Sequence, residues 1–151
     1  MDTSVRMATA ADAGSAAQLL HDFNLEFGDP TPSVAALAAR LARLIAGGET
    51  VLLLGGAGPD CVAVLRFRPA LWSEGLECWL AELYVVPHRR GRGLGRALMT
   101  AALKTARERG ADTMEIGVDE PDVPARRLYE SLGFTNRTAG GDRMFFYARE
   151  L

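Results

Sequence analysis

The chain has few of the residues, and none of the long runs, that mark several classes of protein. Its two cysteines, Cys61 and Cys78, are too few for a disulfide framework. No apolar stretch approaches the length of a membrane span, and the N-terminal residues lack an apolar signal core. No cluster of Cys and His suggests a metal site. These absences predict a cytoplasmic protein with reduced, buried cysteines, no metal and no membrane attachment.

Charge of one sign is not in excess either. The chain carries 17 Lys and Arg against 19 Asp and Glu, a formal net charge of -2, which argues against general nucleic-acid binding. Its 48% hydrophobic and 24% charged residues are ordinary for a globular protein. Because the 151 residues contain no linker, low-complexity tract or internal repeat, we predict a single domain over residues 1–151.

Apolar periodicity and turn signals predict a mixture of strands and helices. We expect strands at residues 4–7, 50–54, 61–68, 78–86, 113–118, 134–138 and 143–149. We expect helices after a Thr9 N-cap and over residues 33–46, 94–109 and 123–132. This order predicts an α/β fold (an α+β mixed sheet) with helices flanking a central sheet. The strand–helix–strand unit at 78–118 is a right-handed crossover, so its two strands should be parallel.

The stretch Glu82–Arg96, ELYVVPHRRGRGLGR, is the most informative in the chain. A β-branched run ends at a proline, and a basic, glycine-spaced loop leads into an amphipathic helix. The start of a helix carries unpaired N–H groups and partial positive charge, which suit an anion. Gly91, Gly93 and Gly95 leave room for a ligand to approach these groups. The stretch predicts a phosphate-bearing ligand; a solvated basic surface is the alternative.

The glycine spacing distinguishes between phosphate ligands. A Walker loop requires Lys followed by Ser or Thr, which does not occur here. A dinucleotide fingerprint requires a third glycine where the chain has Arg96 or Leu98. The pattern that fits is R-x-x-G-x-G, formed by Arg90, Gly93 and Gly95.

This pattern resembles the pyrophosphate loop of the GNAT superfamily of N-acetyltransferases. Three further segments resemble that family: VRMATAADA its first strand and turn, ELYVVP its fourth strand, and ARRLYESLGF its C-terminal A-x-x-L-Y-x-x-x-G-F signature. The resemblance covers nearly the whole chain and implies a GNAT-like fold whose parallel strands four and five are splayed around the ligand. It also implies acetyl-CoA as co-substrate, no metal, and acetyl transfer to a primary amine of a small molecule or a protein.

The resemblance places the coenzyme along the fourth strand, the loop and the C-terminal signature. The cofactor-binding residues that it implies are Leu83, Tyr84, Val85, Val86, Arg90, Gly91, Arg92, Gly93, Leu94, Gly95, Arg96, Asp122 and Ala125. Asp122 stands where the signature usually carries an asparagine, and an ionised carboxylate accepts hydrogen bonds without donating any.

Direct attack by the amine is favoured over an acyl-enzyme because no nucleophile motif occurs. The resemblance puts the Tyr129 hydroxyl near the coenzyme sulfur and makes it the candidate acid; packing in a helical stripe is the alternative. Glu82 is the candidate base, because a carboxylate in an apolar strand is costly unless it faces a polar cleft. An ion pair with an arginine, or water as the base, is the alternative. The oxyanion donor is expected among the N–H groups of Leu83–Val85.

The sequence is also compatible with two other functions: an acyl-CoA sensor without turnover, and an interaction module without a ligand. The apolar run Met144–Tyr147, MFFY, is longer than one buried strand face requires. It predicts a self-association surface and a homodimer, with coverage of both faces inside one subunit as the alternative. The acceptor amine is not identified by any motif.

Overall fold

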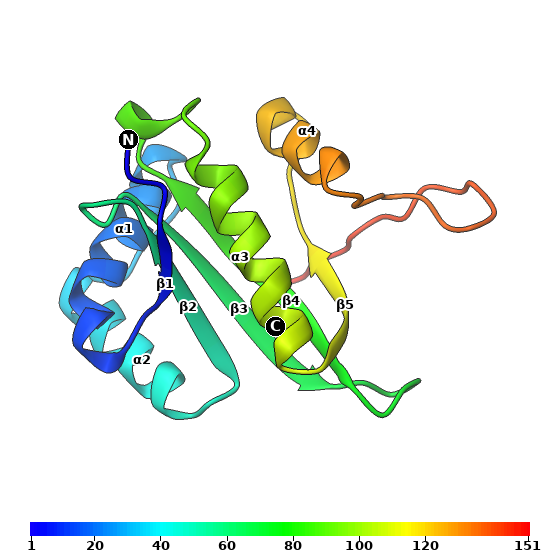
Figure 1. Ribbon diagram of the computed structural model, residues 1–151, viewed down its shortest axis with the longest axis horizontal. Coiled ribbons are helices and arrows are strands. Elements are labelled where there is room, and N and C mark those ends of the chain that lie inside the picture. Colours follow the sequence, from blue (N-terminus) through cyan, green and yellow to red (C-terminus); the bar gives the residue numbers. More distant parts are fainter. The chain divides into compact units, whose positions relative to one another are not determined.

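Five strands form one mixed sheet in the order β1-β2-β3-β4-β5 (Figure 1). They are β1 (Val5–Met7), β2 (Thr50–Gly55), β3 (Cys61–Pro69), β4 (Leu76–Val85) and β5 (Ala111–Ile116). The computed structural model describes residues 1–151 and separates the unit that contains this sheet, residues 1–116, from a second unit, residues 117–151. Neighbouring strands are antiparallel except β4 and β5, which are parallel. The predicted mixed sheet is confirmed.

Helices flank the sheet on both sides. The flanking helices belong to the first unit and are α1 (Ala13–Glu26), α2 (Val34–Ala46) and α3 (Leu94–Glu108), with 3-10 turns η1 (Ala10–Asp12) and η2 (Pro87–Arg89). The second unit contains its own helix, α4 (Val123–Ser131). Figure 1 shows α1 and α2 on one side of the sheet and α3 on the other. Local signals set their starts: Ser33 Oγ accepts the Ala36 N–H at 3.1 Å ahead of α2. Thr9 precedes η1, and Asp12 takes the N-cap position of α1 that we expected for Thr9.

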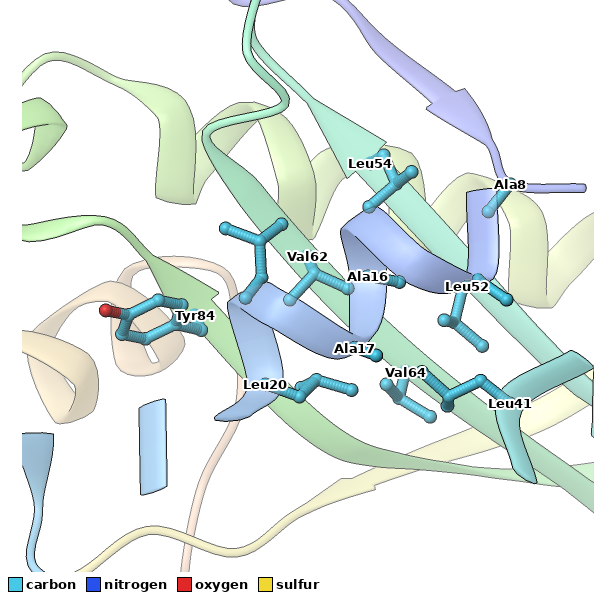
Figure 2. Packing of buried hydrophobic residues seen from close by; sticks show 12 residues of the cluster. Ala8, Ala16, Ala17, Leu20, Leu41, Leu52, Leu54, Val62, Val64 and Tyr84 are labelled. Carbon is cyan, nitrogen blue, oxygen red and sulfur yellow. The ribbon is translucent and has the colours of Figure 1, made fainter. Parts of the chain in front are cut away.

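The main core lies between the sheet and the pair α1 and α2 (Figure 2). Alternate strand residues supply its floor: Leu52, Leu54, Val62, Val64 and Tyr84. The other sheet face packs under α3, whose buried stripe is Leu94, Leu98, Met99, Ala102 and Ala106. Strand alternation and the helical period account for these buried stripes.

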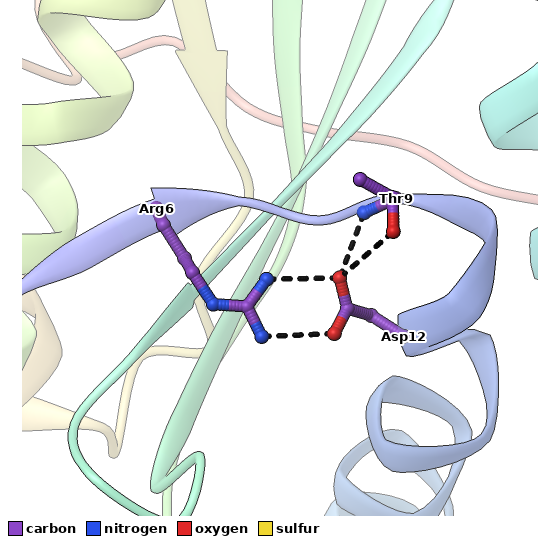
Figure 3. A network of polar contacts seen from close by, with 3 residues as sticks. All are labelled: Arg6, Thr9 and Asp12. Carbon is purple, nitrogen blue, oxygen red and sulfur yellow. Dashed lines mark hydrogen bonds and ion pairs between the residues drawn. The ribbon is translucent and has the colours of Figure 1, made fainter.

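A polar cluster ties β1 to the start of α1 (Figure 3). Both Nη atoms of Arg6 donate to the Asp12 carboxylate, at 2.9 and 2.8 Å, and the Thr9 N–H donates to Asp12 Oδ2 at 2.8 Å. The hydrogen bonds from Arg6 hold the pKa of Asp12 well below its usual range. The two residues of this bidentate pair are only six positions apart in the sequence.

A β-bulge in β4 decides which face Glu82 occupies. Glu82 lies opposite Val64, whereas Leu80 lies opposite Leu65, so one extra residue, Ala81, sits between them. The even-numbered residues before Ala81 lie on the α3 side of the sheet. Those after it, Glu82 and Tyr84, lie on the α1 side. The bulge therefore turns a carboxylate away from the α3 core.

The second unit does not contain the two strands predicted at 134–138 and 143–149, and that prediction is wrong. One isolated bridge joins Arg137 and Arg143, closed by a Thr138 N–H to Asp142 carbonyl bond of 2.8 Å. A strand exists only where a partner completes its hydrogen-bond ladder, and the apolar pattern alone does not supply one. Met144–Tyr147 is consequently exposed.

Both cysteines are free and buried, as predicted. Burial raises the pKa of the Cys61 and Cys78 thiols to about 11, so neither forms a thiolate near neutral pH. No group of three His, Cys, Asp or Glu side chains is placed to hold a metal ion. The helices are all too short or too polar to cross a bilayer.

Candidate active site

Strands β4 and β5 part before β4 ends. Their parallel pairing reaches only Leu80 opposite Ile116, whereas β4 continues to Val85. The edge of β4 after Leu80 therefore has no strand beside it on the β5 side. This is the splay expected of strands four and five, and it leaves main-chain groups open to a ligand.

The direction of these groups follows from the pairing with β3. The Val86 N–H donates to the Asp60 carbonyl at 2.9 Å, so it points toward β3. Successive residues of a strand direct their N–H and C=O groups to opposite sides. The N–H groups of Leu83 and Val85 consequently point to the open edge, which is where an extended ligand arm or an oxyanion could be bound.

The loop between η2 and α3 has the geometry of an anion cradle. Gly91 has φ 73° and Gly93, the residue before α3, has φ 90°, a region that side chains other than glycine rarely adopt. A Cβ at either glycine would meet no protein atom within 4 Å, so the space above the loop is open. The first intrahelical bond of the turn runs from Ala97 N to Gly93 O. The N–H groups of the first turn lie at the positive end of α3, where a helix favours an anion.

The residues flanking the glycines are anchored differently. Leu94 is buried and fixes the start of α3 in the core, while Arg92 and Arg96 are exposed. Arg89 lies 3.7 Å from the Asp60 carboxylate, and Arg90 is paired with Glu26 at 2.8 Å. The arginine run is therefore not a uniform basic surface, since two of its members bind carboxylates from distant parts of the chain.

Glu82 lies on the α1 face of β4, the same face as Tyr84. Its side chain is accessible to solvent, and no ion pair with an arginine is found. Partial burial of the carboxylate, followed by the negative charge of Asp29, raises the pKa of Glu82 above its usual value. A carboxylate of raised pKa beside an open strand edge is suited to accept a proton.

Asp29 belongs to a segment, residues 28–32, that the end of α1 holds in place. The Asp29 N–H donates to the Asn24 carbonyl at 2.8 Å, and Asn24 Nδ2 donates to the Pro30 carbonyl at 3.1 Å. The His21 ring lies 3.0 Å from the Pro32 carbonyl through Nδ1. These bonds hold the segment in place, and its Asp29 acts on the charge of Glu82. No motif in the sequence indicates this segment.

Tyr84 is buried against the end of α1. Its ring stacks on Phe23, with centroids 5.0 Å apart, and its hydroxyl donates to Glu26 at 3.2 Å. Glu26 also binds both Nη atoms of Arg90. Sequence reasoning missed Glu26, because nothing at the end of an amphipathic helix signals a partner 64 residues away.

In the second unit, α4 carries the other predicted site residues. Asp122 Oδ1 accepts the Ala125 N–H at 3.2 Å, so the residue that replaces the usual asparagine caps the helix. Tyr129 is buried, with its ring 6.1 Å from that of Phe134. Burial, with a smaller effect of Asp122, raises the pKa of Tyr129 to about 12, so the hydroxyl stays protonated at neutral pH.

The predicted residues thus form two groups. The first unit brings together the β4 edge, Glu82 and the glycine loop, which include Leu83, Tyr84, Val85, Val86, Arg90, Gly91, Arg92, Gly93, Leu94, Gly95 and Arg96. The second unit brings together Asp122, Ala125 and Tyr129 on α4.

Known proteins with similar sequences and structures include acetyltransferases. The model of the acetyltransferase (GNAT) family matches residues 16–134. A crystal structure of a protein from Arthrobacter sp. FB24 assigned to the acetyltransferases is 51% identical, with a TM-score of 0.92, over 98% of this chain and 96% of that one.

Two curated relatives differ in how much of their length is matched. A mycothiol acetyltransferase of Thermobispora bispora is 51% identical over 69 residues, which are 44% of this chain and 23% of the relative. An uncharacterised N-acetyltransferase of Bacillus subtilis is 27% identical over 137 residues, 89% of this chain and 91% of the relative. This chain therefore spans about a quarter of the mycothiol enzyme and most of the other.

Proposed function

Because this chain belongs to the acetyltransferase (GNAT) family, we propose that it is an acetyl-CoA-dependent N-acetyltransferase. The observation that carries the proposal is the open edge of β4 directly beside a glycine-lined helix start. The edge suits the extended arm of the coenzyme, and the helix start suits its pyrophosphate. The space above Gly91 and Gly93 is suited to the pyrophosphate, because neither glycine has a side chain that would keep the phosphate groups away from the main chain.

We assign each step of acetyl transfer to a different group of the protein. Bound acetyl-CoA supplies a thioester that an amine can attack directly. Glu82 takes the proton that the amine loses, and an N–H of Leu83 or Val85 stabilises the negative charge that develops on the carbonyl oxygen. Tyr129 gives a proton to the departing thiolate. The loop Gly91–Arg96 holds the pyrophosphate through main-chain N–H groups.

The acceptor is proposed to be a primary amine of a small molecule, with a protein amine as the other class. Similarity to a mycothiol acetyltransferase supports the small-molecule class. The reduced, buried cysteines fit a cytoplasmic location. The direct test is a panel of amines with acetyl-CoA, followed by release of free thiol. Tight acetyl-CoA binding with no thiol release for any amine would favour an acyl-CoA sensor instead.

Replacing Gly93 with valine should weaken acetyl-CoA binding by about tenfold to a hundredfold. The valine must adopt φ near 90°, and its branched side chain fills the space above the loop. Isothermal titration calorimetry measures the change. Gly48→Val is the matched control, because Gly48 has φ 80° and equally open surroundings but lies in the turn after α2. Equal affinity for Gly93→Val and the parent protein would rule out the loop as the phosphate site.

We also propose that the protein is a homodimer. Met144, Phe145, Phe146 and Tyr147 are 50%, 72%, 83% and 88% exposed, a run of apolar surface that a second copy would cover. Sedimentation velocity at micromolar concentration should therefore show a dimer, and a Phe145→Ser, Phe146→Ser double variant should be a monomer. A monomeric parent protein at these concentrations would contradict the proposal.

A further inference from the structure

Glu26, the last residue of α1, binds the residue that opens the R-x-x-G-x-G loop. Its Oε2 accepts Arg90 Nη1 at 2.8 Å and its Oε1 accepts Arg90 Nη2 at 2.9 Å, a bidentate pair. The Tyr84 hydroxyl adds a third bond to Oε1 at 3.2 Å. The donors, Tyr84 and Arg90, belong to β4 and the loop, whereas the acceptor, Glu26, belongs to α1.

The rest of the Arg90 side chain is also bound to protein. Its Nε donates to the Val85 carbonyl at 2.9 Å, and its guanidinium carbon lies 5.6 Å from the centre of the Tyr84 ring. Val85 ends β4, so the one side chain ties the strand end, the loop and α1 together. Its charge is balanced by Glu26 before any phosphate arrives.

The loop needs such an anchor. Between Arg90 and Leu94 lie Gly91 and Gly93, both at positive φ, and a glycine-rich loop has many conformations when it is held at one end only. Leu94 is buried and fixes the far end. The pair of Arg90 and Glu26 fixes the near end, and the stack of Phe23 on Tyr84 keeps α1 against β4.

We infer that Glu26 is a positioning residue, which holds Arg90 so that the loop is preformed for the coenzyme and is coupled to the C-terminal end of α1. Arg90 then acts on the coenzyme by shaping the loop, and the main-chain N–H groups make the phosphate contacts. The inference rests on the proposed function, because it concerns the same coenzyme site. Glu26 is a different kind of carboxylate from Glu82: it is saturated by three donors and unavailable as a base.

The direction in which Glu26→Gln changes the affinity for acetyl-CoA distinguishes this positioning role from direct binding of phosphate by Arg90. If Arg90 were a phosphate ligand held back by Glu26, Glu26→Gln would free its charge and acetyl-CoA would bind more tightly. If Glu26 positions the loop, the same substitution loosens the loop, and binding weakens by about three- to tenfold, the cost of ordering one or two side chains. Turnover at saturating acetyl-CoA should change little, and the dependence of kcat/KM on pH should be the same as in the parent protein.

The experiment compares acetyl-CoA dissociation constants by calorimetry for the parent protein, Glu26→Gln, Arg90→Gln and the double variant. In the Arg90→Gln background, Glu26→Gln should have almost no further effect, because its partner is already gone. Asp12→Asn is the matched control, since it breaks a bidentate arginine pair of the same kind outside the site. Its acetyl-CoA affinity should equal that of the parent protein.

The results test the proposed function and the positioning role of Glu26 separately. A parent protein that fails to bind acetyl-CoA contradicts the proposed function itself. If the parent binds, tighter or unchanged binding by Glu26→Gln overturns the positioning role alone. Fully additive effects of the two substitutions, or an equal loss in Asp12→Asn, would also overturn it, because they would point to independent action or to general stability.

Discussion

Replacing Tyr129 with phenylalanine should lower the turnover number by about a hundredfold to ten-thousandfold, the usual contribution of a positioned acid. The substitution removes only the hydroxyl that we propose gives a proton to the leaving thiolate. Burial raises the pKa of Tyr129 to about 12, so in the parent protein this hydroxyl carries its proton throughout the neutral range. Steady-state release of thiol at saturating acetyl-CoA and acceptor measures the effect.

Two further measurements on Tyr129→Phe separate chemistry from structure. The ring still packs 6.1 Å from Phe134, so the unfolding temperature should stay close to that of the parent protein. The acetyl-CoA dissociation constant should also be nearly unchanged, because the loop of Gly91 and Gly93 lies in the other unit of the chain. A variant that turns over at the parent rate would make Tyr129 a packing residue and water the acid.

Glu82→Gln should lower kcat/KM by about a hundredfold to ten-thousandfold, because the amine would lose its base. It should also change the pH dependence. Burial and Asp29 raise the pKa of Glu82 above the usual 4.5, so in the parent protein kcat/KM rises as the pH passes upward through this raised pKa and Glu82 loses its proton. Below it, Glu82 is protonated and cannot accept a proton. Glutamine does not titrate, so this limb should disappear.

Glu77→Gln is the matched control for Glu82. Glu77 lies on the same strand, at its other end, where its carboxylate pairs with Arg68 at 2.6 Å. Its substitution should leave both the rate and the pH profile as they are in the parent protein. If kcat/KM of Glu82→Gln still fell at low pH, titration of another group, or of the acceptor amine itself, would be the cause. Water would then be the proton acceptor.

Features that depend on neighbouring residues could be read from the sequence. The start of α2 near Ser33 and the start of α3 after Gly93 depend on residues within about one turn of chain, and the structure contains both. The parallel pairing of β4 and β5 followed from chain connectivity and the handedness of the crossover. The prediction that the glycine loop is an anion site rests on the same kind of local pattern.

Features that depend on a partner were predicted less well. The apolar pattern near Phe145 and Phe146 indicated a strand, yet it forms none, because a strand also requires a ladder of hydrogen bonds from another segment. The sequence did not indicate the bulge at Ala81, which decides the side of the sheet on which Glu82 and Tyr84 lie. Strand propensity describes a single segment, whereas register and bulges belong to a pair of strands.

The sequence by itself determined the family, the order of most elements and the position of the glycine loop, since these depend on patterns within short stretches of chain. Only the tertiary structure decided which carboxylates meet the arginines. Asp60 faces Arg89, and Glu26 binds Arg90 across 64 residues of sequence. The physical reason is that an ion pair depends on the distance between two side chains in space. That distance is set by how α1 packs on the sheet, and no local pattern of residues records it.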